Sequence, residues 1–336
     1  MVPVRSKVLV TGAGGFIGYH LVSFLKGRGY WVRGVDLKRP EFCAIDADEF
    51  EILDLRKWDN CLAATRGVDA VYALAADMGG MGFISCNHAQ ILHNNSLINL
   101  HTLEAARLNA VRRYLYTSSA CVYPEYRQLT TNVTPLKETD AYPAEPQDAY
   151  GWEKLITEQL CMHYRRDYGL ETRIVRFHNI FGPYGTWDGG REKAPAALCR
   201  KIAMAKLTGV DEIEIWGDGE QTRSFCYIDD CIRGIYKLMH SDFNRPLNLG
   251  QDRMVSINQL AVMIADIANI HVRMRHVPGP QGVRGRNSDN TLLKTVLNWT
   301  PEISLEEGLA KTYAWIESQV YARMQEPQSS CVFEVA

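Results

Sequence analysis

The sequence reads KVLVTGAGGFIG from Lys7 to Gly18 and continues as an amphipathic stretch to Lys26. The apolar run before the glycines predicts a strand, and the amphipathic stretch after them predicts a helix. Glycines between a strand and a helix let backbone N–H groups approach a pyrophosphate at the positive helix end. The glycine spacing differs by one residue from the usual dinucleotide-binding fingerprint. The residues expected to contact a dinucleotide here are Gly12, Gly15, Phe16, Ile17 and Gly18.

An acidic residue at the end of the next predicted strand supports this interpretation. A glycine cluster alone would also fit a plain tight turn, but Asp36 ends the strand Trp31 to Asp36, roughly 20 residues after the loop. There a carboxylate accepts hydrogen bonds from the adenosine ribose hydroxyls and repels a 2′-phosphate, which favours NAD over NADP. Asp54 is a candidate partner for the adenine amino group, and an ordinary helix cap is its alternative role.

Apolar runs and amphipathic stretches alternate along the first half of the chain. Further strands are expected at Asp69 to Ala75, Arg113 to Ser118 and Thr172 to Phe177, and helices near Arg56 to Thr65, Ala89 to Leu108 and Tyr150 to Tyr168. This alternation predicts a parallel sheet covered on both faces. The expected fold class is therefore α/β: a Rossmann-type doubly wound parallel sheet with a smaller mixed α/β C-terminal substrate domain.

The alternation breaks after about Asn179. Beyond it the sequence predicts helices near Ala194 to Ala205 and Ile257 to Ala268, and strands at Glu212 to Trp216 and near Val272 to His276. We therefore expect an NAD-binding domain of residues 1–178 together with roughly 220–250. The substrate domain would take residues 179–219 and 251–325, and residues 326–336 would form a tail.

The overall composition is that of an ordinary soluble protein, with 46% hydrophobic and 23% charged residues. Its 37 basic and 39 acidic residues give a net charge of -2, which offers no reason to expect nucleic acid or an anionic membrane as partner. No stretch reaches the ~18 apolar residues of a spanning helix, and Met1 to Ser6 do not read as a secretory leader, so we expect a cytoplasmic location. Nine scattered cysteines predict neither a disulfide framework nor a metal site.

A tyrosine and a lysine four residues apart are candidates for proton transfer. Tyr150 and Lys154 share a face of their predicted helix, and a nearby ammonium group favours the phenolate, so we expect Lys154 to lower the pKa of Tyr150. Tyr150 would then take a hydroxyl proton from the substrate. Ser119 follows a strand that ends at the cofactor crevice and is expected to share that proton. Many helices contain such a pair by chance, so the prediction depends on the combination of these features.

Cys121 and Lys193 are candidates for a second acid/base pair. Cys121 lies two residues beyond Ser119 and, if the strand continues, projects to the same side. Local positive charge favours a thiolate, and desolvation lowers the pKa of a lysine. Without further context, a buried structural thiol and a solvated surface lysine are the commoner fates of these residue types.

The glycine loop, Asp36, Ser119 and the pair Tyr150 and Lys154, in this order, resemble the extended short-chain dehydrogenase/reductase family over nearly the whole chain. Four further segments closely resemble the GDP-mannose 3,5-epimerase family: Leu74 to Phe83, Ser118 to Pro124, Gly189 to Pro195 and Gly282 to Asp289. The catalytic residues implied by the resemblance are Ser119, Cys121, Tyr150, Lys154 and Lys193.

The resemblance also implies a reaction, a recycled NAD cofactor that Tyr150 and Lys154 contact, and a homodimer built on a four-helix interface. Oxidation of GDP-mannose at C4 would acidify the hydrogens on C3 and C5, and inversion followed by re-reduction would give GDP-L-galactose. Inversion at C5 alone would give GDP-L-gulose. The implied substrate-binding residues are Gly79, Gly80, Ser119, Asn179, Glu192, Lys193, Lys201, Gln221, Arg223 and Arg286, and Arg284 is a weaker candidate.

Other functions are weighed against this one. A 4,6-dehydratase would need an acidic pair after Ser119, and a simple 4-epimerase would need neither Cys121 nor Lys193. An epimerase-reductase of the GDP-fucose synthase type also uses a cysteine near this position, but its histidine partner is replaced by Lys193, and Asp36 disfavours NADPH. A non-catalytic NAD-binding regulator would have lost the tyrosine, lysine or cysteine, and this chain retains all three.

Overall fold

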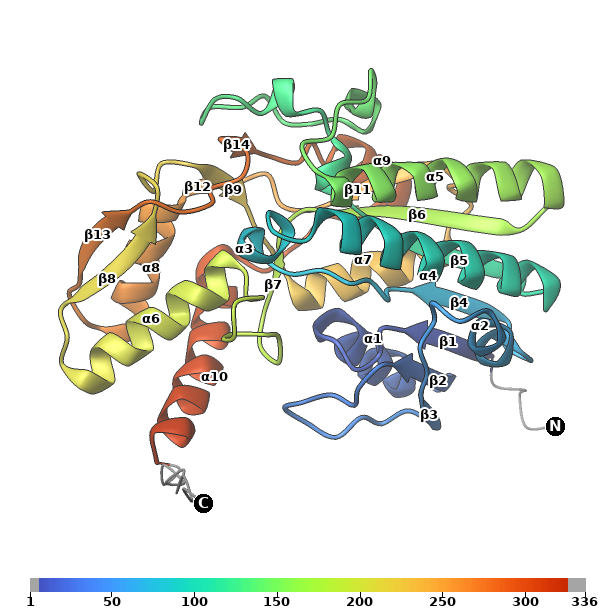
Figure 1. Cartoon of the computed structure of the whole chain (residues 1–336), viewed down its shortest axis with the longest axis horizontal. Helices are drawn as coiled ribbons and strands as arrows, with labels where there is room; N and C mark the ends of the chain where they lie inside the picture. The colour runs from blue at the N-terminus through green and yellow to red at the C-terminus, as the bar shows by residue number, and fades with distance from the viewer. Residues whose placement is uncertain (1–5, 326–336) are drawn as a thin grey trace, which may run out of the picture.

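A seven-stranded parallel sheet forms the centre of the larger part of the molecule (Figure 1). The computed structural model describes residues 6–325. From one edge to the other the strands are β11 (Pro246–Leu249), β6 (Glu171–Phe177), β5 (Arg113–Ser119), β4 (Ala70–Ala73), β1 (Lys7–Thr11), β2 (Trp31–Asp36) and β3 (Glu49–Ile52). The strand order reverses between β1 and β4, and in such sheets the crevice beyond the carboxyl ends at this point binds ligands.

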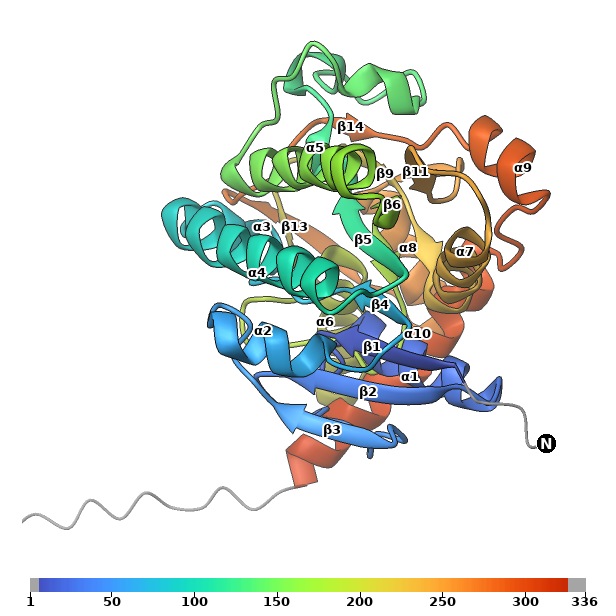
Figure 2. The ribbon, with the colours of Figure 1, turned by 90° about the vertical axis from the view of Figure 1, so that its right-hand side faces the viewer.

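Helices cover both faces of the sheet, as the alternating pattern predicts (Figure 2). One face carries α1 (Phe16–Gly27) and α7 (Ile228–His240), and the other carries α2 (Trp58–Thr65), α4 (His88–Leu108) and α5 (Ala149–Tyr168). The central strands are buried along almost their whole length, since both faces are covered. The predicted Rossmann-type fold class is confirmed.

Most of the remaining helices and strands lie beyond the carboxyl ends of the central strands, whereas α9 packs against the edge strand β11. The helices are α6 (Ala194–Thr208), α8 (Ile257–Ala268), α10 (Leu305–Gln325), α9 (Thr291–Leu297) and the short α3 (Met81–Ile84). Small sheets pair β8 (Glu212–Trp216) with β13 (Arg273–Val277), β7 (Ile180–Phe181) with β10 (Cys226–Tyr227), and β9 (Thr222–Ser224) with both β12 (Met254–Ser256) and β14 (Gly285–Arg286). One hydrophobic core extends from α1 and α7 into α6, α8 and α10. The division into two domains at the expected boundaries therefore stays a prediction, and the expected tail at 326–336 lies outside the described residues.

Most predicted elements agree with the structure within two or three residues. The strand Glu212–Trp216 and the helix Ile257–Ala268 have the predicted bounds. The predictions do not include the helices α7 (Ile228–His240) and α10, nor the edge strand β3, whose exposed glutamates weaken the apolar pattern. Among the helices within residues 6–325, we find none with the length and hydropathy of a membrane-spanning segment.

Residues 120–148, called the arm below, leave the sheet after β5 and return at α5. The arm contains three short 3-10 turns, η1 (Ala120–Val122), η2 (Glu125–Arg127) and η3 (Glu138–Ala141). It is fixed by backbone hydrogen bonds to the segment around β14, among them Arg284 N to Gln128 O at 3.0 Å and Leu136 N to Asn287 O at 3.0 Å. Two segments far apart in the sequence thus lie side by side above the carboxyl end of β5 (Figure 1).

A buried ion pair joins β5, β6, α5 and the arm. Arg176 on β6 donates to Glu158 on α5 through Nη2 at 2.7 Å and Nε at 2.9 Å, and both side chains are fully buried. The Ser118 hydroxyl donates to Glu158, while Arg176 also donates to Tyr123 Oη at 3.2 Å and Glu138 O at 2.7 Å. The residues on either side of Ser119 and Cys121 are thereby anchored to one charged pair.

Glu158→Ala is expected to lower the free energy of unfolding by about 3 to 5 kcal/mol, because it leaves the Arg176 charge buried without its partner. The matched control is Glu104→Ala on the neighbouring helix α4, which removes a 2.6 Å ion pair with Arg107 between half-exposed side chains. That loss is expected to stay below about 1 kcal/mol. Urea unfolding followed by circular dichroism measures both, and equal destabilisation by the two variants would contradict the role given to the buried pair.

Candidate active site

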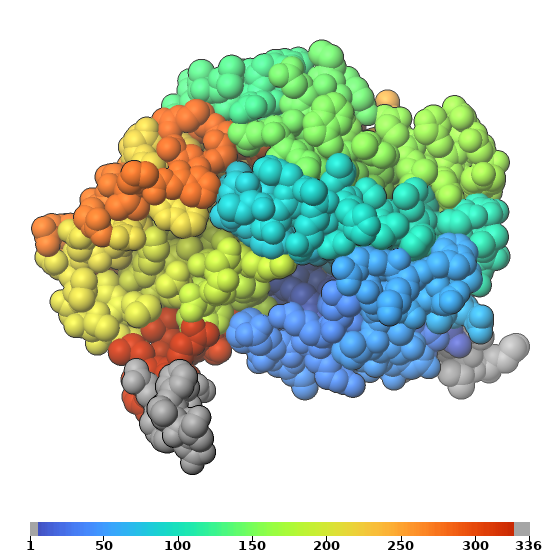
Figure 3. All heavy atoms as spheres, viewed as in Figure 1, coloured from blue at the N-terminus to red at the C-terminus, as the bar shows by residue number. Residues whose placement is uncertain are grey.

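A single cavity of about 900 Å³ lies at the carboxyl ends of β1, β2, β4 and β5 and extends beneath α6 and β8. Figure 3 shows its mouth as a recess between the N-terminal segments and those of α6. Every residue that the sequence predicts as a site residue, apart from the weaker candidate Arg284, lines this cavity. They are Gly12, Gly15, Phe16, Ile17, Gly18, Asp36, Asp54, Gly79, Gly80, Ser119, Cys121, Tyr150, Lys154, Asn179, Glu192, Lys193, Lys201, Gln221, Arg223 and Arg286.

The glycine loop is held tightly between β1, β2 and α1. Gly12 has a φ of 69°, a conformation that favours glycine, and a Cβ at Gly18 would lie only 2.0 Å from Gly12 O. Asp36 Oδ2 accepts a hydrogen bond from Gly14 N at 2.9 Å, so the carboxylate that ends β2 also fixes the loop. Burial raises the pKa of Asp36, and hydrogen bonds from three backbone N–H groups oppose this shift. The glycine backbone can approach a pyrophosphate closely, and Asp36 beside it can accept hydrogen bonds from ribose hydroxyls. The loop therefore suits a dinucleotide whose ribose 2′-hydroxyl is free of phosphate.

Asp54 lines the same end of the cavity but is already paired. Its carboxylate accepts from Arg56 Nε and Nη2, each at 2.9 Å, and this contact holds the pKa of Asp54 below its usual value. The N-cap of α2 is Lys57, so the alternative role of Asp54 as the cap of that helix is wrong. One carboxylate oxygen also accepts from Arg56 N, forming a turn that leads into α2.

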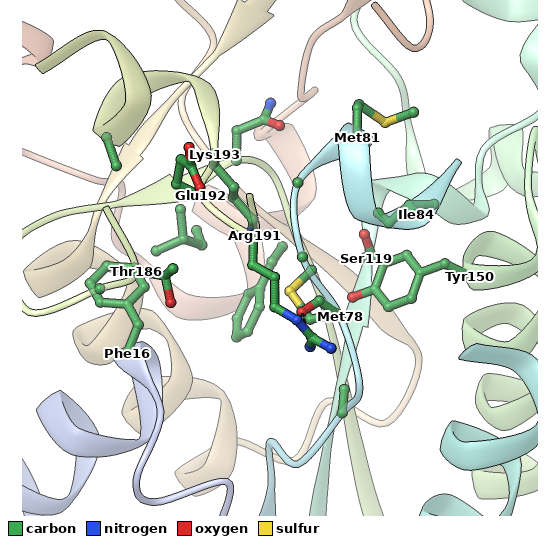
Figure 4. Close-up of a pocket in the computed structure, with 18 of the residues that line it drawn as sticks. Phe16, Met78, Met81, Ile84, Ser119, Tyr150, Thr186, Arg191, Glu192 and Lys193 are labelled. Carbon is green, nitrogen blue, oxygen red and sulfur yellow. Dashed lines mark hydrogen bonds between the residues drawn. The ribbon is translucent and has the colours of Figure 1, made fainter. Parts of the chain in front are cut away.

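Tyr150 and Ser119 lie beside each other on one wall of the cavity (Figure 4). The Asp148 side chain accepts from Gly151 N and caps α5, which places Tyr150 in the first turn, at the cavity edge. Lys154 Nζ donates to Thr117 O at 3.1 Å and lies 5.4 Å from the centre of the Tyr150 ring. The structure thus brings the serine, tyrosine and lysine together, as predicted.

The expected effect of Lys154 on the tyrosine is wrong for the protein alone. Burial raises the pKa of Tyr150 well above its usual value, the nearby Cys121 and Glu153 add to the increase, and the Ser119 hydroxyl opposes it. Glu153 is itself buried, with its Oε1 3.5 Å from Lys154 Nζ, and this carboxylate offsets the lysine charge. Tyr150 is therefore a neutral phenol in this state, and its ionisation needs further positive charge.

Cys121 does not lie on an extension of β5, so that expectation is wrong. The strand ends at Ser119, whose Oγ accepts from Cys121 N at 3.1 Å and caps the 3-10 turn η1. This turn directs Cys121 to the same cavity by a different route. Its sulfur accepts a hydrogen bond from Arg286 Nη1 at 3.3 Å, a contact that the sequence pattern does not indicate.

Lys193 stands at the N-cap of α6, on the opposite side of the cavity from Tyr150 and Ser119 (Figure 4). Pro195 lies in the first turn of that helix and presets its backbone angle, and Gly209 ends the helix in the left-handed conformation. The lysine side chain is open to the cavity, and the protein that surrounds the cavity lowers its pKa. Cys121 is close enough to counteract this shift, so the two groups interact electrostatically.

The two glycine segments around the cavity pack against each other. Gly80 N donates to Arg191 O at 3.0 Å, and a Cβ at Gly80 would lie 2.4 Å from Glu192 O. The missing side chain of Gly80 therefore makes room for the backbone of Glu192, and α3 begins directly afterwards at Met81. Arg191, which sequence reasoning missed, reaches back across the cavity to Asp77 Oδ1 at 3.0 Å (Figure 4).

Polar groups converge at the far end of the cavity, beneath β8 and β9. Lys201 Nζ donates to Glu214 O at 2.6 Å, and Asn179 Nδ2 donates to Ser224 O at 2.8 Å. Gln221 Nε2 donates to Trp216 O at 3.3 Å, whereas its buried Oε1 has no partner among the described residues. Burial and the Arg286 charge lower the pKa of Arg223 to about 9, which leaves a guanidinium in a pocket that favours an anion.

Arg284, the weaker candidate, lies outside this cavity. It pairs with Asp218 through two contacts of 2.9 and 3.0 Å near the surface. Arg284 is therefore held in a surface ion pair and does not face the cavity.

Gly18→Ala is expected to weaken NAD binding by about tenfold or more, because the new Cβ would displace the loop that must approach the pyrophosphate. The matched control is Gly27→Ala in the same helix, where a Cβ meets nothing within 4 Å. It should bind NAD like the unsubstituted protein. Titration calorimetry with NAD tests both, and unchanged affinity in the Gly18 variant would contradict this account of the loop.

Comparison with known proteins agrees with this geometry. Residues 8–250 match the model of the NAD dependent epimerase/dehydratase family. The chain is 55% identical over 318 residues to GDP-mannose 3,5-epimerase 1 of Oryza sativa subsp. japonica, covering 94% of this chain and 83% of that protein. It is 54% identical over 316 residues to GDP-mannose 3,5-epimerase of Arabidopsis thaliana, with the same coverage of both chains.

The solved structures extend the comparison to the fold. The crystal structure of UDP-glucose 4-epimerase with UDP-glucose from Thermotoga maritima superposes with a TM-score of 0.84. Its sequence is 27% identical, and the match covers 94% of this chain and 99% of that chain. The two chains thus share the arrangement of sheet and helices.

Proposed function

The chain belongs to the NAD dependent epimerase/dehydratase family, and we propose that it converts GDP-mannose to GDP-L-galactose by inversion at C3 and C5. The observation that carries this proposal is the meeting of Tyr150, Cys121 and Lys193 in one cavity with the dinucleotide loop. A simple 4-epimerase would need only the first of these side chains. Release of GDP-L-gulose after inversion at C5 alone is part of the same proposal.

The first step assigned to this chain is removal of the proton from the C4 hydroxyl by Tyr150. The glycine loop and Asp36 would hold NAD, which would supply a hydride acceptor for oxidation at C4, a hydride donor for the later reduction, and positive charge near the buried phenol. The Ser119 hydroxyl lies within hydrogen-bonding reach of the Tyr150 hydroxyl. The Lys154 ammonium group lies 5.4 Å from the centre of the Tyr150 ring. This arrangement supplies the charge that the neutral Tyr150 needs in order to ionise.

The inversions are assigned to Cys121 and Lys193. A ketone at C4 makes the hydrogens on both neighbouring carbons acidic, and inversion needs a base on one face and an acid on the other. Cys121 sits beside β5 with an arginine at its sulfur, and Lys193 enters from α6 with a pKa lowered by its surroundings. Both groups thus line the cavity from different elements, as inversion of one bound sugar requires.

We assign the far end of the cavity to the GDP portion. Arg223 and Arg286 provide guanidinium groups for the diphosphate, whose oxygens match their planar forks. Gln221 Oε1 is a buried acceptor that lacks a partner among the described residues, and it suits an N–H group of the base. Asn179, Glu192 and Lys201 complete the polar wall around the sugar and base.

Incubation of the purified protein with GDP-mannose tests this assignment. We expect two new hexoses, GDP-L-galactose and GDP-L-gulose, at equilibrium with the substrate and without net formation of NADH. Chromatography and NMR of the products make the measurement. Consumption of added NADPH with a deoxysugar substrate, or no conversion by protein that has NAD bound, would contradict the proposal.

Cys121→Ala is expected to lower the rate of inversion at least about a hundredfold, since one of the two proton-transfer groups is lost. Oxidation at C4 should continue, because Tyr150, Ser119 and Lys154 are intact. The readout is product formation beside the absorbance of enzyme-bound NADH. Cys86→Ala, which replaces an exposed thiol outside the cavity lining, is the matched control and should keep full activity. Normal inversion by the Cys121 variant would refute its assigned role.

We also propose that the protein is a homodimer through α4 and α5. These helices pack side by side and leave apolar side chains exposed: Leu92 and Leu100 on α4, and Trp152 and Ile156 on α5. Ile156 is the most exposed of these four side chains, at 60%. A second copy of the same face would bury this surface as four antiparallel helices, a self-complementary arrangement typical of two-fold dimers.

Ile156→Glu is expected to convert the dimer to a monomer at micromolar concentration, because each subunit would have to bury a carboxylate in the interface. Val262→Glu is the matched control, since it places the same charge on an exposed apolar site of α8 away from this face. Light scattering coupled to gel filtration gives the mass of each protein. A dimeric Ile156 variant would place the interface elsewhere.

A cytoplasmic location remains a proposal as well. Its support is the composition of the chain, whose apolar stretches all fall short of a spanning helix. Fractionation of cells that express the protein is the direct measurement.

A further inference from the structure

Arg286 makes a contact that the proposed substrate role does not explain. Its Nη1 lies 3.3 Å from Cys121 Sγ, and the arginine is only 8% exposed. A guanidinium group beside sulfur favours the thiolate over the neutral thiol, because a hydrogen bond to the charged form is the stronger one. The contact therefore bears on the state of the thiol before any substrate enters.

The direction of the Arg286 side chain is fixed by Gln128. The Gln128 side chain is fully buried, and its Oε1 accepts from Arg286 Nε at 2.6 Å. The backbone carbonyl of Gln128 accepts from Arg284 N at 3.0 Å and Gly285 N at 3.3 Å. Gln128 thus holds both the side chain of Arg286 and the strand that carries it.

The same side chain also holds the segment that carries the thiol. Gln128 Nε2 donates to Tyr123 O and Pro124 O, each at 3.1 Å, and these carbonyls directly follow the turn that contains Cys121. One amide therefore links the thiol turn to the arginine that faces the thiol. Only an amide has both the acceptor and the two donors that this position uses.

The neutrality of Gln128 matters for the charge at the sulfur. A carboxylate at this position would also accept from Arg286 Nε, but it would take up much of the positive charge of the guanidinium. An uncharged acceptor orients the arginine and leaves its charge available to Cys121. Arg286 has five N–H donors, and its side-chain contacts within residues 6–325 use two of them, so the other donors could bind a diphosphate.

We propose that Gln128 is a positioning residue that holds Arg286 against Cys121 and thereby maintains the reactivity of this thiol. The inference rests on the proposed function only in giving the thiol a part in proton transfer. The reactivity of the thiol itself requires no substrate, so it can be tested separately from epimerase activity.

The test is alkylation of the full chain by iodoacetamide at neutral pH, with each cysteine followed by peptide mass spectrometry. Exposed Cys86 serves as the internal reference, so the readout is the ratio of the Cys121 rate to the Cys86 rate. In Gln128→Met this ratio is expected to fall by about tenfold, the order expected for loss of one charge-assisted hydrogen bond. Gln251→Met, a half-buried glutamine outside the cavity lining, is the matched control and should leave the ratio unchanged.

A double variant separates positioning from a general structural effect. Arg286→Met is expected to lower the ratio by about tenfold as well, and adding Gln128→Met to it should lower the ratio no further. Independent, multiplying effects of the two substitutions would overturn the proposal, because Gln128 would then not act through Arg286. A wild-type ratio in folded Gln128→Met would overturn it directly.

Gln128→Glu covers the case in which Gln128→Met fails to fold, since glutamate keeps the size and the acceptor oxygen. It should also lower the ratio, because the new carboxylate neutralises Arg286, and an unchanged ratio would contradict the proposal. Deuterium exchange into GDP-mannose distinguishes the two hypotheses. If thiol reactivity falls as expected but wild-type protein exchanges no sugar hydrogen, the positioning role stands and the proposed substrate fails.

Discussion

The ion pair between Glu158 and Arg176 supports the part of the structure on which the site depends. It is buried between α5 and β6, so both charges are desolvated, and such a pair is stable only when further hydrogen bonds satisfy it. Ser118, Tyr123 and the arm provide those bonds. Since Ser118 and Tyr123 bracket the residues Ser119 to Val122, the geometry of the thiol turn follows from the way this charge is buried.

The two walls of the cavity carry different ionisable groups. The wall formed by β5 and α5 carries a buried phenol, a serine and a lysine, and burial keeps the phenol neutral in the protein alone. The wall formed by α6 carries Lys193, whose surroundings favour loss of its proton. Cys121 stands between them with an arginine at its sulfur. The proposed oxidation and inversion would therefore use separate groups on one bound sugar.

The sequence predicts the part of this arrangement that depends on local pattern. Asp36 and the glycine loop follow from the alternation of strand and helix, and the pairing of Tyr150 with Lys154 follows from their spacing on one helix. The short loops of the parallel sheet then bring these residues to one edge. Cys121 was placed in the right cavity for a wrong reason, because the serine cap that ends β5 is a hydrogen bond and leaves no periodic signal.

Contacts between distant segments could not be predicted in this way. Gln128 and Arg286 are separated by 158 positions, and Asp77 and Arg191 by 114, so no spacing rule joins them. The pKa of Tyr150 was predicted in the wrong direction for the protein alone, because the depth of burial and the nearby Glu153 depend on tertiary packing. The resemblance to relatives suggests roles for individual residues, but only the structure shows which groups surround those residues.

The most direct test of the account is NMR of GDP-mannose incubated with the protein in D₂O without added reductant. The account predicts deuterium at both C3 and C5, with new hexose signals and no net NADH, because one cavity holds the oxidising centre and both proton-transfer groups. Deuterium at C5 alone would contradict the double inversion. No exchange by protein with NAD bound would contradict GDP-mannose as the substrate.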